Sequence, residues 1–327
     1  MQEIGLIVGY LIIFVLMSNI AGEKRYRLAA HMIVLAGVVV AAVGIYQYFI
    51  TNVAQLKSLE SMGHDMLARQ LASMINRAFG SFSSANGFAG YLILIIPVAI
   101  GLLIYERDIR LRVWLGLALA TISAAEYFAF SKGSLLALAL ALGVLIIGGL
   151  LKTGRSKKAP LVLLIGLAAG TPLYILWTFF NGRISAVATN IGGRVELWRG
   201  AWQLIIKRPI LGSGPGTFGT EITQHQVGSV YSPYAHNTYL QMGAEIGLVG
   251  LAAFITAMVI ILVFAWKRFR DSRLEGQVAD KGREISRDAW LRLGLIASLV
   301  GFLAHNFVDY TWYVPGVALI FWFIAGL

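Results

Sequence analysis

The sequence contains no cysteine and few charged residues, and both shortages restrict what the chain can be. Without cysteine it can form no disulfide framework and no metal site or cluster with Cys ligands. Charged residues make up 13% of the chain and hydrophobic residues 58%, and the mean hydropathy is +0.74. Soluble domains average about 25% charged and about 45–50% apolar residues. The composition therefore predicts an all-α, polytopic integral membrane protein.

Long apolar runs predict where this chain crosses the membrane. A helix needs about 20 apolar residues to cross a hydrocarbon layer of about 30 Å. Nine runs come close to this length, two of them short. We predict membrane spans at residues 4–20, 28–50, 88–105, 113–130, 134–151, 160–180, 240–265, 293–308 and 314–327.

The positions of Lys and Arg predict the orientation of these spans. The net charge is +11, and most of the 27 basic residues lie in alternate loops, with the densest group at 266–292. By the positive-inside rule these loops are cytoplasmic, so the basic balance reports topology and we expect no nucleic-acid partner. The N-terminus then lies outside, although residues 1–10 lack the features of a signal peptide. We therefore expect an odd number of helices before Met1.

Two long connections, 51–87 and 181–237, lie on the outer side in this topology, within a single transmembrane domain covering 1–327. Apolar residues at near-helical spacing in 53–75 predict a helix that lies in the interface or packs on its neighbours. A second helix is predicted to begin at Arg194 and to stop before Pro209. The segment 211–218 (LGSGPGTF) predicts a turn and not a dinucleotide site, because no strand precedes it.

Arg77, Arg194 and His236 are the candidate functional residues, since each lies where an outer loop meets a helix. Guanidinium groups match phosphate oxygens bidentately, so the three could converge on an anion at the membrane surface. The alternative for either arginine is a headgroup anchor, and for His236 a structural hydrogen bond.

The remaining polar residues near the spans allow functional and structural interpretations. Glu245 could brace the site, pair with a cation or have a neutral structural role, and Glu126 could pair with Lys132. His305 and Asp309 are one helical turn apart, and they either line the same cavity or form a satisfied polar pair at a helix end. No metal site is predicted, because no paired-carboxylate motif occurs among the outer acids.

Several segments together resemble the O-antigen ligase and Wzy-type polymerase superfamily of bacterial membrane glycosyltransferases, from about residue 44 onward. The strongest pieces are 77–91 (RAFGSFSSANGFAGY), 131–134 (SKGS), 193–198 (GRVELW), 212–218 (GSGPGTF), 236–241 (HNTYLQ) and 244–250 (AEIGLVG). The chain departs from the family at 84–86, where Asn-Pro-Asn is common, and at Lys132, where Arg is common. Members usually have about twelve spans, so the resemblance also implies helices before Met1.

The resemblance implies a glycosyltransferase site at the outer face of the bacterial cytoplasmic membrane, facing the periplasm or the cell exterior. The donor would be a glycan on polyprenyl (undecaprenyl) diphosphate, and the acceptor a sugar hydroxyl on a glycan, lipid or protein-linked partner. Arg77 and Arg194 would stabilise the leaving diphosphate, and His236 would take the acceptor proton. Further substrate contacts are expected from Arg199, Lys132, Asn237, Glu245 and His305. The transfer would invert the anomeric centre, with neither cofactor nor metal.

Three alternatives remain at this stage. A Wzy-like polymerase and a protein O-oligosaccharyltransferase use the same donor chemistry with another acceptor, and the sequence does not separate them from a ligase. A small-solute transporter, such as one for inorganic carbon, should show repeated halves and polar residues at the bilayer midplane. Only Glu126 and Glu245 are acids within the predicted spans, and no halves repeat. Transport is therefore weaker than glycan transfer, and a purely structural membrane protein is a further alternative of about the same weight as transport.

Overall fold

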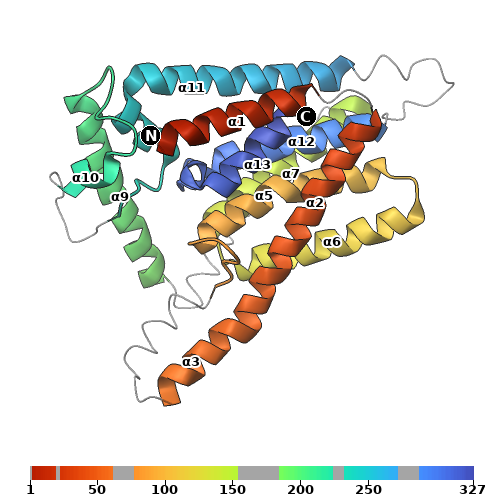
Figure 1. The fold of residues 1–327 in the computed structure, drawn as a ribbon, viewed down its shortest axis with the longest axis horizontal. Coiled ribbons are helices and arrows are strands. Elements are labelled where there is room, and N and C mark those ends of the chain that lie inside the picture. Colours follow the sequence, from red (N-terminus) through yellow and green to blue (C-terminus); the bar gives the residue numbers. More distant parts are fainter. Residues whose placement is uncertain (1, 20–22, 62–76, 154–183, 224–231, 272–286) are drawn as a thin grey trace.

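A computed structural model describes residues 2–19, 23–61, 77–153, 184–223, 232–271 and 287–327 of the chain. Throughout these ranges the regular structure is helical (Figure 1), as the composition predicts. The elements are α1 (Gln2–Ser18), α2 (Glu23–Tyr46), η1 (Gln47–Thr51), α3 (Asn52–Ser61), α5 (Ala85–Tyr105), α6 (Ile109–Phe128), α7 (Lys132–Thr153), α9 (Ile184–Lys207), α10 (Phe218–Thr223), α11 (Thr238–Asp271), α12 (Arg287–His305), η2 (Thr311–Tyr313) and α13 (Pro315–Gly326).

Six of the helices are long and apolar enough to cross a membrane, which makes this a multi-pass membrane protein. They are Arg25–Leu59, Ala85–Tyr105, Ile109–Phe128, Lys132–Leu150, Thr238–Asp271 and Arg287–His305. Two shorter apolar helices, Gly5–Ser18 and Pro315–Gly326, correspond to the two predicted spans at the ends of the chain. The predicted span 160–180 lies outside the described residues. The count of nine spans therefore stays a prediction.

Helix α5 is the centre of the fold. It is apolar on all sides, and almost every residue from Ala85 to Leu102 is buried among α2, α6, α7, α12 and α13. Its closest neighbour is α12. A Cβ atom at Gly101 would lie 2.6 Å from the carbonyl oxygen of Trp290, and one at Gly294 would lie 2.6 Å from that of Pro97. Two glycines therefore allow the backbones of α5 and α12 to touch.

Basic residues from two of the predicted cytoplasmic loops lie at one end of α5 and α12. Arg27, just inside α2, forms a two-pronged ion pair of 2.6 and 2.7 Å with the buried Glu106 carboxylate at the end of α5. Arg287, the first residue of α12, donates to the Glu106 carbonyl oxygen at 3.1 Å. The opposite ends of the same helices, Ala85 and His305, are about 30 Å away along the α5 axis, from its length of 21 residues. That second end holds the candidate site.

The two long connections differ in two places from the prediction. The residues after position 50 continue as a helix: α2, the π-helical turn η1 and α3 form one run that ends at Ser61. The predicted helix over 53–75 is present only as α3 in the described part, and the rest of it lies outside. Helix α9 was predicted to begin at Arg194, but it begins ten residues earlier, at Ile184, and runs to Lys207. Apolar residues such as Val187 and Ile191 extend its helical pattern backwards.

Candidate active site

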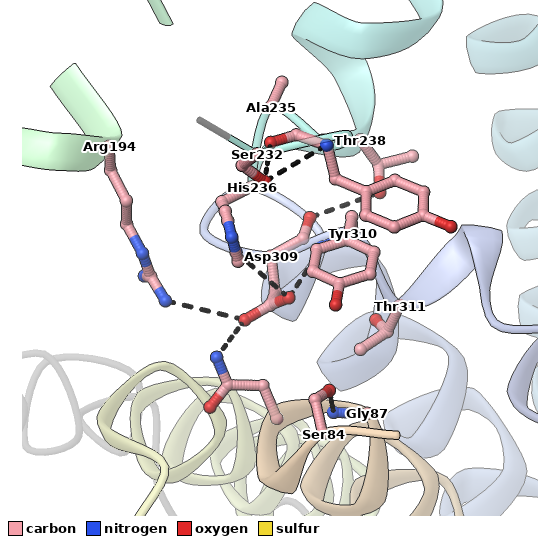
Figure 2. A network of polar contacts seen from close by, with 12 residues as sticks. Ser84, Gly87, Arg194, Ser232, Ala235, His236, Thr238, Asp309, Tyr310 and Thr311 are labelled. Carbon is pink, nitrogen blue, oxygen red and sulfur yellow. Dashed lines mark hydrogen bonds and ion pairs between the residues drawn. The ribbon is translucent and has the colours of Figure 1, made fainter. Parts of the chain in front are cut away.

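The buried carboxylate of Asp309 is the centre of the site (Figure 2). Its Oδ2 atom accepts a hydrogen bond of 2.6 Å from Nδ2 of Asn86 and lies 3.6 Å from Nη2 of Arg194. Its Oδ1 atom accepts from the backbone N–H of Tyr310 at 2.8 Å and lies 3.7 Å from Nδ1 of His236. One carboxylate thus faces residues from α5, from α9, from the segment just before α11 and from the turn after α12.

Arg77 joins the same network through Asn86. Its Nη2 atom donates to Oδ1 of Asn86 at 2.7 Å, and its Nε atom donates to the carbonyl oxygen of Ala129 at 2.8 Å. The amide of Asn86 therefore bridges two charged groups, accepting from Arg77 and donating to Asp309. Two hydrogen bonds therefore fix the orientation of the planar Arg77 guanidinium group. A lysine ammonium group, which is a point charge, could not be oriented in this way.

The chain around Arg77 is held by the π-helical turn. Oε1 of Gln47 accepts from the backbone N–H groups of Phe79 and Gly80, at 3.1 and 2.8 Å. Ser84 then caps α5, its Oγ accepting from Gly87 N at 3.0 Å, and Ala85 begins the helix. In the family's common Asn-Pro-Asn, the first Asn would stand at the cap position of Ser84 and the Pro at the first helical position of Ala85, and both residue types suit these positions. The departure from that segment therefore leaves Asn86 in place.

The site carries more positive than negative charge. Burial lowers the pKa of Arg77, Asp309 raises it, and the neighbouring positive charge of Arg194 lowers it again. Burial also raises the pKa of Asp309, but the contact with His236 and the charges of His305 and His236 outweigh this, so its pKa falls below the usual value. Asp309 therefore stays ionised at neutral pH. Two guanidinium groups share this single carboxylate, which leaves positive charge for an anion.

His236 is held in an uncommon backbone conformation beside Asp309. Its φ angle is +50°, in the left-handed region, which costs a residue other than glycine free energy and clusters at functional sites. Contacts of its two neighbours enforce it. The backbone N–H of Ala235 donates to Oε1 of Gln241 at 3.0 Å, and Oδ1 of Asn237 accepts from the backbone N–H groups of residues 239 and 240, each at 3.0 Å. The imidazole edge also packs on the ring of Tyr310, with centroids 4.9 Å apart.

The meeting of α11 with the end of α12 brings His236 to Asp309. The backbone N–H of Thr238 donates to the carbonyl oxygens of Asn306 and Asp309, at 2.9 and 3.1 Å. Its hydroxyl donates to Oδ1 of Asn306 at 2.6 Å, and the same oxygen accepts from Trp312 N–H at 2.9 Å. These bonds are buried, so the first turn of α11 and the turn after α12 form one rigid unit.

The glycine-rich segment fills a break in α11. Gly247 has φ +70°, and a Cβ atom there would lie 2.1 Å from the carbonyl oxygen of Ile210. At the break, backbone groups of α11 bond to the glycine-rich segment and the residues before it. Gly214 N–H donates to the Glu245 carbonyl oxygen at 2.8 Å, and Leu248 N–H donates to the Pro209 carbonyl oxygen at 2.8 Å. The segment thus forms a turn, as predicted, and it packs against helix backbone.

Glu245 braces this turn. Its carboxylate accepts from the backbone N–H of Phe218 at 3.3 Å, from Nε2 of Gln241 at 3.1 Å and from the hydroxyl of Tyr313 at 3.2 Å. It therefore ties together α10, α11 and η2. These contacts are structural, and a contact of Glu245 with the substrate stays a prediction.

The other predicted substrate contacts lie apart from Asp309 or have structural contacts. Arg199 is exposed on α9, about 140° around the helix from Arg194. Lys132 is exposed at the start of α7. Glu126 accepts a hydrogen bond from Ser134, and its pairing with Lys132 stays a prediction. Asn237 uses its amide oxygen to cap α11. His305 is fully buried, with Nδ1 3.4 Å from the Thr311 hydroxyl.

Asn86 and Asp309 are the members of the network that were not among the predicted site residues. Asp309 was noted only together with His305, as a residue that either lines the same cavity or forms a polar pair, and Asn86 only as one residue of a resembling segment. Neither has a local sequence pattern that marks it as a site residue, because their contacts join distant parts of the chain.

Within the described ranges, no group of three or more His, Asp or Glu is placed to hold a metal ion.

Comparison with known families adds one finding. Residues 117–255 match the family model described as O-antigen ligase. The matched segment contains Arg194, the glycine-rich turn and His236, while Arg77 and Asp309 lie before and after it. A search of curated proteins found no match to this chain.

Proposed function

We propose that this chain, whose residues 117–255 match the O-antigen ligase family, transfers a glycan from a polyprenyl diphosphate to an acceptor hydroxyl at the outer face of the cytoplasmic membrane. The family supports a membrane glycosyltransferase of the ligase or polymerase type. The observation that carries the proposal is the convergence of Arg77, Arg194 and His236 around Asp309. These residues come from three separate segments, yet they meet at the outer end of the central helix.

The two arginines suit the leaving group. When the bond between the anomeric carbon and the diphosphate oxygen breaks, negative charge develops on that oxygen. Preorganised cations stabilise such charge without having to donate a proton. Arg77 is already oriented by Asn86 and Ala129. Arg194 lies 3.6 Å from Asp309, longer than a hydrogen bond, so this contact is an ion pair that leaves its donors able to meet phosphate oxygens.

His236 suits the acceptor. Its Nδ1 atom faces the Asp309 carboxylate, which favours the tautomer with the proton on Nδ1 and leaves Nε2 as a base. The acceptor hydroxyl oxygen attacks the anomeric carbon, its proton passes to Nε2, and the diphosphate leaves with the bonding electron pair. A single displacement of this kind inverts the anomeric centre. In this scheme Asp309 is a positioning residue that orients the base.

The distribution of charge supports the outer location. Arg27 and Arg287, from two of the basic loops, meet at Glu106, and the site lies at the opposite ends of α5 and α12. By the positive-inside rule the Glu106 end is cytoplasmic. The site then faces the periplasm or the exterior of a bacterial inner membrane, where lipid-linked glycans would reach it from the lipid.

The test is a transfer assay on the purified full-length chain, with a polyprenyl-diphosphate glycan and separate sugar, lipid-linked and protein acceptors. We expect release of polyprenyl diphosphate together with a glycosylated acceptor, and the acceptor that works distinguishes a ligase from a polymerase or a protein glycosyltransferase. His236→Ala and Arg194→Ala should abolish transfer while the protein remains inserted. Normal transfer by His236→Ala would disprove the base assignment. Movement of a labelled solute across vesicles with no bond broken would instead indicate a transporter.

A further inference from the structure

A second polar feature lies at the other end of the molecule, remote from Asp309. Helices α1, α2, α11, α12 and α13 surround a cavity of about 270 Å³. Much of its wall is apolar side chain, and its polar lining includes Tyr26, Arg268 and Arg292. The apolar wall includes Phe14, Ile260, Phe264, Leu295, Leu299 and Ile324.

Two arginines lie at the polar end of the cavity. Nε of Arg292 is 2.6 Å from the Asp288 carboxylate, and its guanidinium lies 5.9 Å from the centre of the Tyr26 ring. Arg268 supplies a second cation, near the end of α11. The hydroxyl of Tyr26 is buried and has no hydrogen-bond partner within the described ranges. A buried hydroxyl of this kind is costly unless it is satisfied, so it is available to donate to a ligand oxygen.

We propose that this cavity binds an anionic phospholipid. The headgroup phosphate lies between Arg268 and Arg292 and accepts from the Tyr26 hydroxyl, and an acyl chain follows the apolar wall between α11 and α12. A free phosphate ion would leave that wall in contact with water. A zwitterionic headgroup would bring its own positive charge to a site that already has two arginines against the single carboxylate of Asp288. The site is independent of the proposed transfer reaction.

The position of the cavity fits this ligand. Tyr26 and Arg292 are close in sequence to Arg27 and Arg287, which gather around Glu106 at the basic end. That end meets the cytoplasmic leaflet under the positive-inside rule, and this leaflet carries the anionic lipid. A basic pocket between transmembrane helices on the cytoplasmic side is a common form of recognition for anionic headgroups.

The first experiment is native mass spectrometry of the full-length protein in detergent, titrated with phosphatidylglycerol or phosphatidylcholine of matched acyl chains. We expect phosphatidylglycerol to bind at least about fivefold more tightly. Arg268→Gln and Arg292→Gln should each weaken it about fivefold, the effect of one basic residue near an anionic lipid. Arg270→Gln is the matched control, because Arg270 is an exposed neighbour on the same helix that does not line the cavity. Equal binding of the two lipids would overturn the proposal.

A second pair of measurements separates a lipid in the cavity from a lipid on a charged surface. Ala265→Phe places a ring in the cavity wall and changes no charge, and it should reduce phosphatidylglycerol binding at least as much as the arginine variants do. Unchanged binding in Ala265→Phe would mean that surface charge alone is responsible, and the proposal would fail. Glycerol phosphate, which has no acyl chain, should not compete. If it competes as well as the lipid, the ligand is a free phosphate and the proposal is wrong.

Discussion

Nδ2 of Asn86 donates a hydrogen bond of 2.6 Å to Oδ2 of Asp309, across 223 positions of sequence. This bond joins the first turn of the central helix α5 to the turn that follows α12. Through it, the guanidinium group of Arg77 is connected to the carboxylate that faces Arg194 and His236. The bond links the two halves of the site that we propose for the diphosphate and the acceptor.

We expect Asp309→Asn to reduce the rate of transfer by about 10² to 10⁴ while leaving donor binding largely intact. The amide keeps the size of the side chain but removes the charge that holds the proton on Nδ1 of His236, which is the effect of replacing the orienting carboxylate in a catalytic triad. The measurement is kcat against KM for the donor. Asp288→Asn is the control, because Asp288 pairs with Arg292 at the basic end. A normal kcat would show that Asp309 does not orient the base.

Arg77→Lys should lose about 10- to 100-fold in transfer, even though the charge is kept. Lysine cannot reach the Ala129 carbonyl and the Asn86 amide with one rigid group, so the cation would no longer be fixed where the leaving oxygen develops charge. Arg208→Lys provides the matched control, since Arg208 forms an exposed pair with Glu221 at 3.3 Å. If both variants retain full activity, Arg77 acts only as an anchor.

Removal of the bridging amide should affect both sides of the site. In Asn86→Ala, Arg77 loses one of its two acceptors and Asp309 loses its shortest hydrogen bond, so we expect slower transfer and a lower melting temperature together. The loss of a buried partner costs about 1–3 kcal/mol of folding free energy. Transfer and thermal unfolding in detergent are measured on the same preparation. An unchanged rate in a destabilised variant would show that the bridge serves folding alone.

The pH dependence of stability should report Asp309. Its pKa is below the ordinary value of about 4, so its ionised form stabilises the fold above that pH, and this contribution disappears as the pH falls from about 4 through the lower pKa of the folded state. We expect the difference in melting temperature between the wild type and Asp309→Asn to be constant from pH 8 to about 5 and to shrink below about 4. A difference that does not change in acid would contradict this assignment.

Gly247→Ala should destabilise the protein by about 1–3 kcal/mol and disturb the site from a distance. A side chain at φ +70° is strained, and its Cβ would collide with the backbone of Ile210, so the glycine-rich turn could not dock in the break of α11. Thermal unfolding and transfer assays both apply. Gly116→Ala, where the added Cβ meets nothing within 4 Å, should be neutral or slightly stabilising. Equal behaviour of the two variants would show that the break tolerates a side chain.

The sequence by itself determined the class of the protein, most of its spanning helices and the three residues at the centre of the proposal. Hydropathy and loop charge are local properties, and they report directly on partition into a membrane and on orientation. The start of α9 was misplaced because the helix continues beyond the amphipathic stretch that marked it.

Tertiary structure alone decided how the polar residues divide into roles. Asn86 and Asp309 belong to the site because the ends of α5 and α12 meet, and no spacing along the chain encodes that contact. Glu245 and Asn237 resemble site residues in sequence, yet their side chains accept from backbone amides at the start of α10 and at the start of α11. Buried polar groups must find partners wherever packing places them, so their function follows from the fold and not from the local sequence.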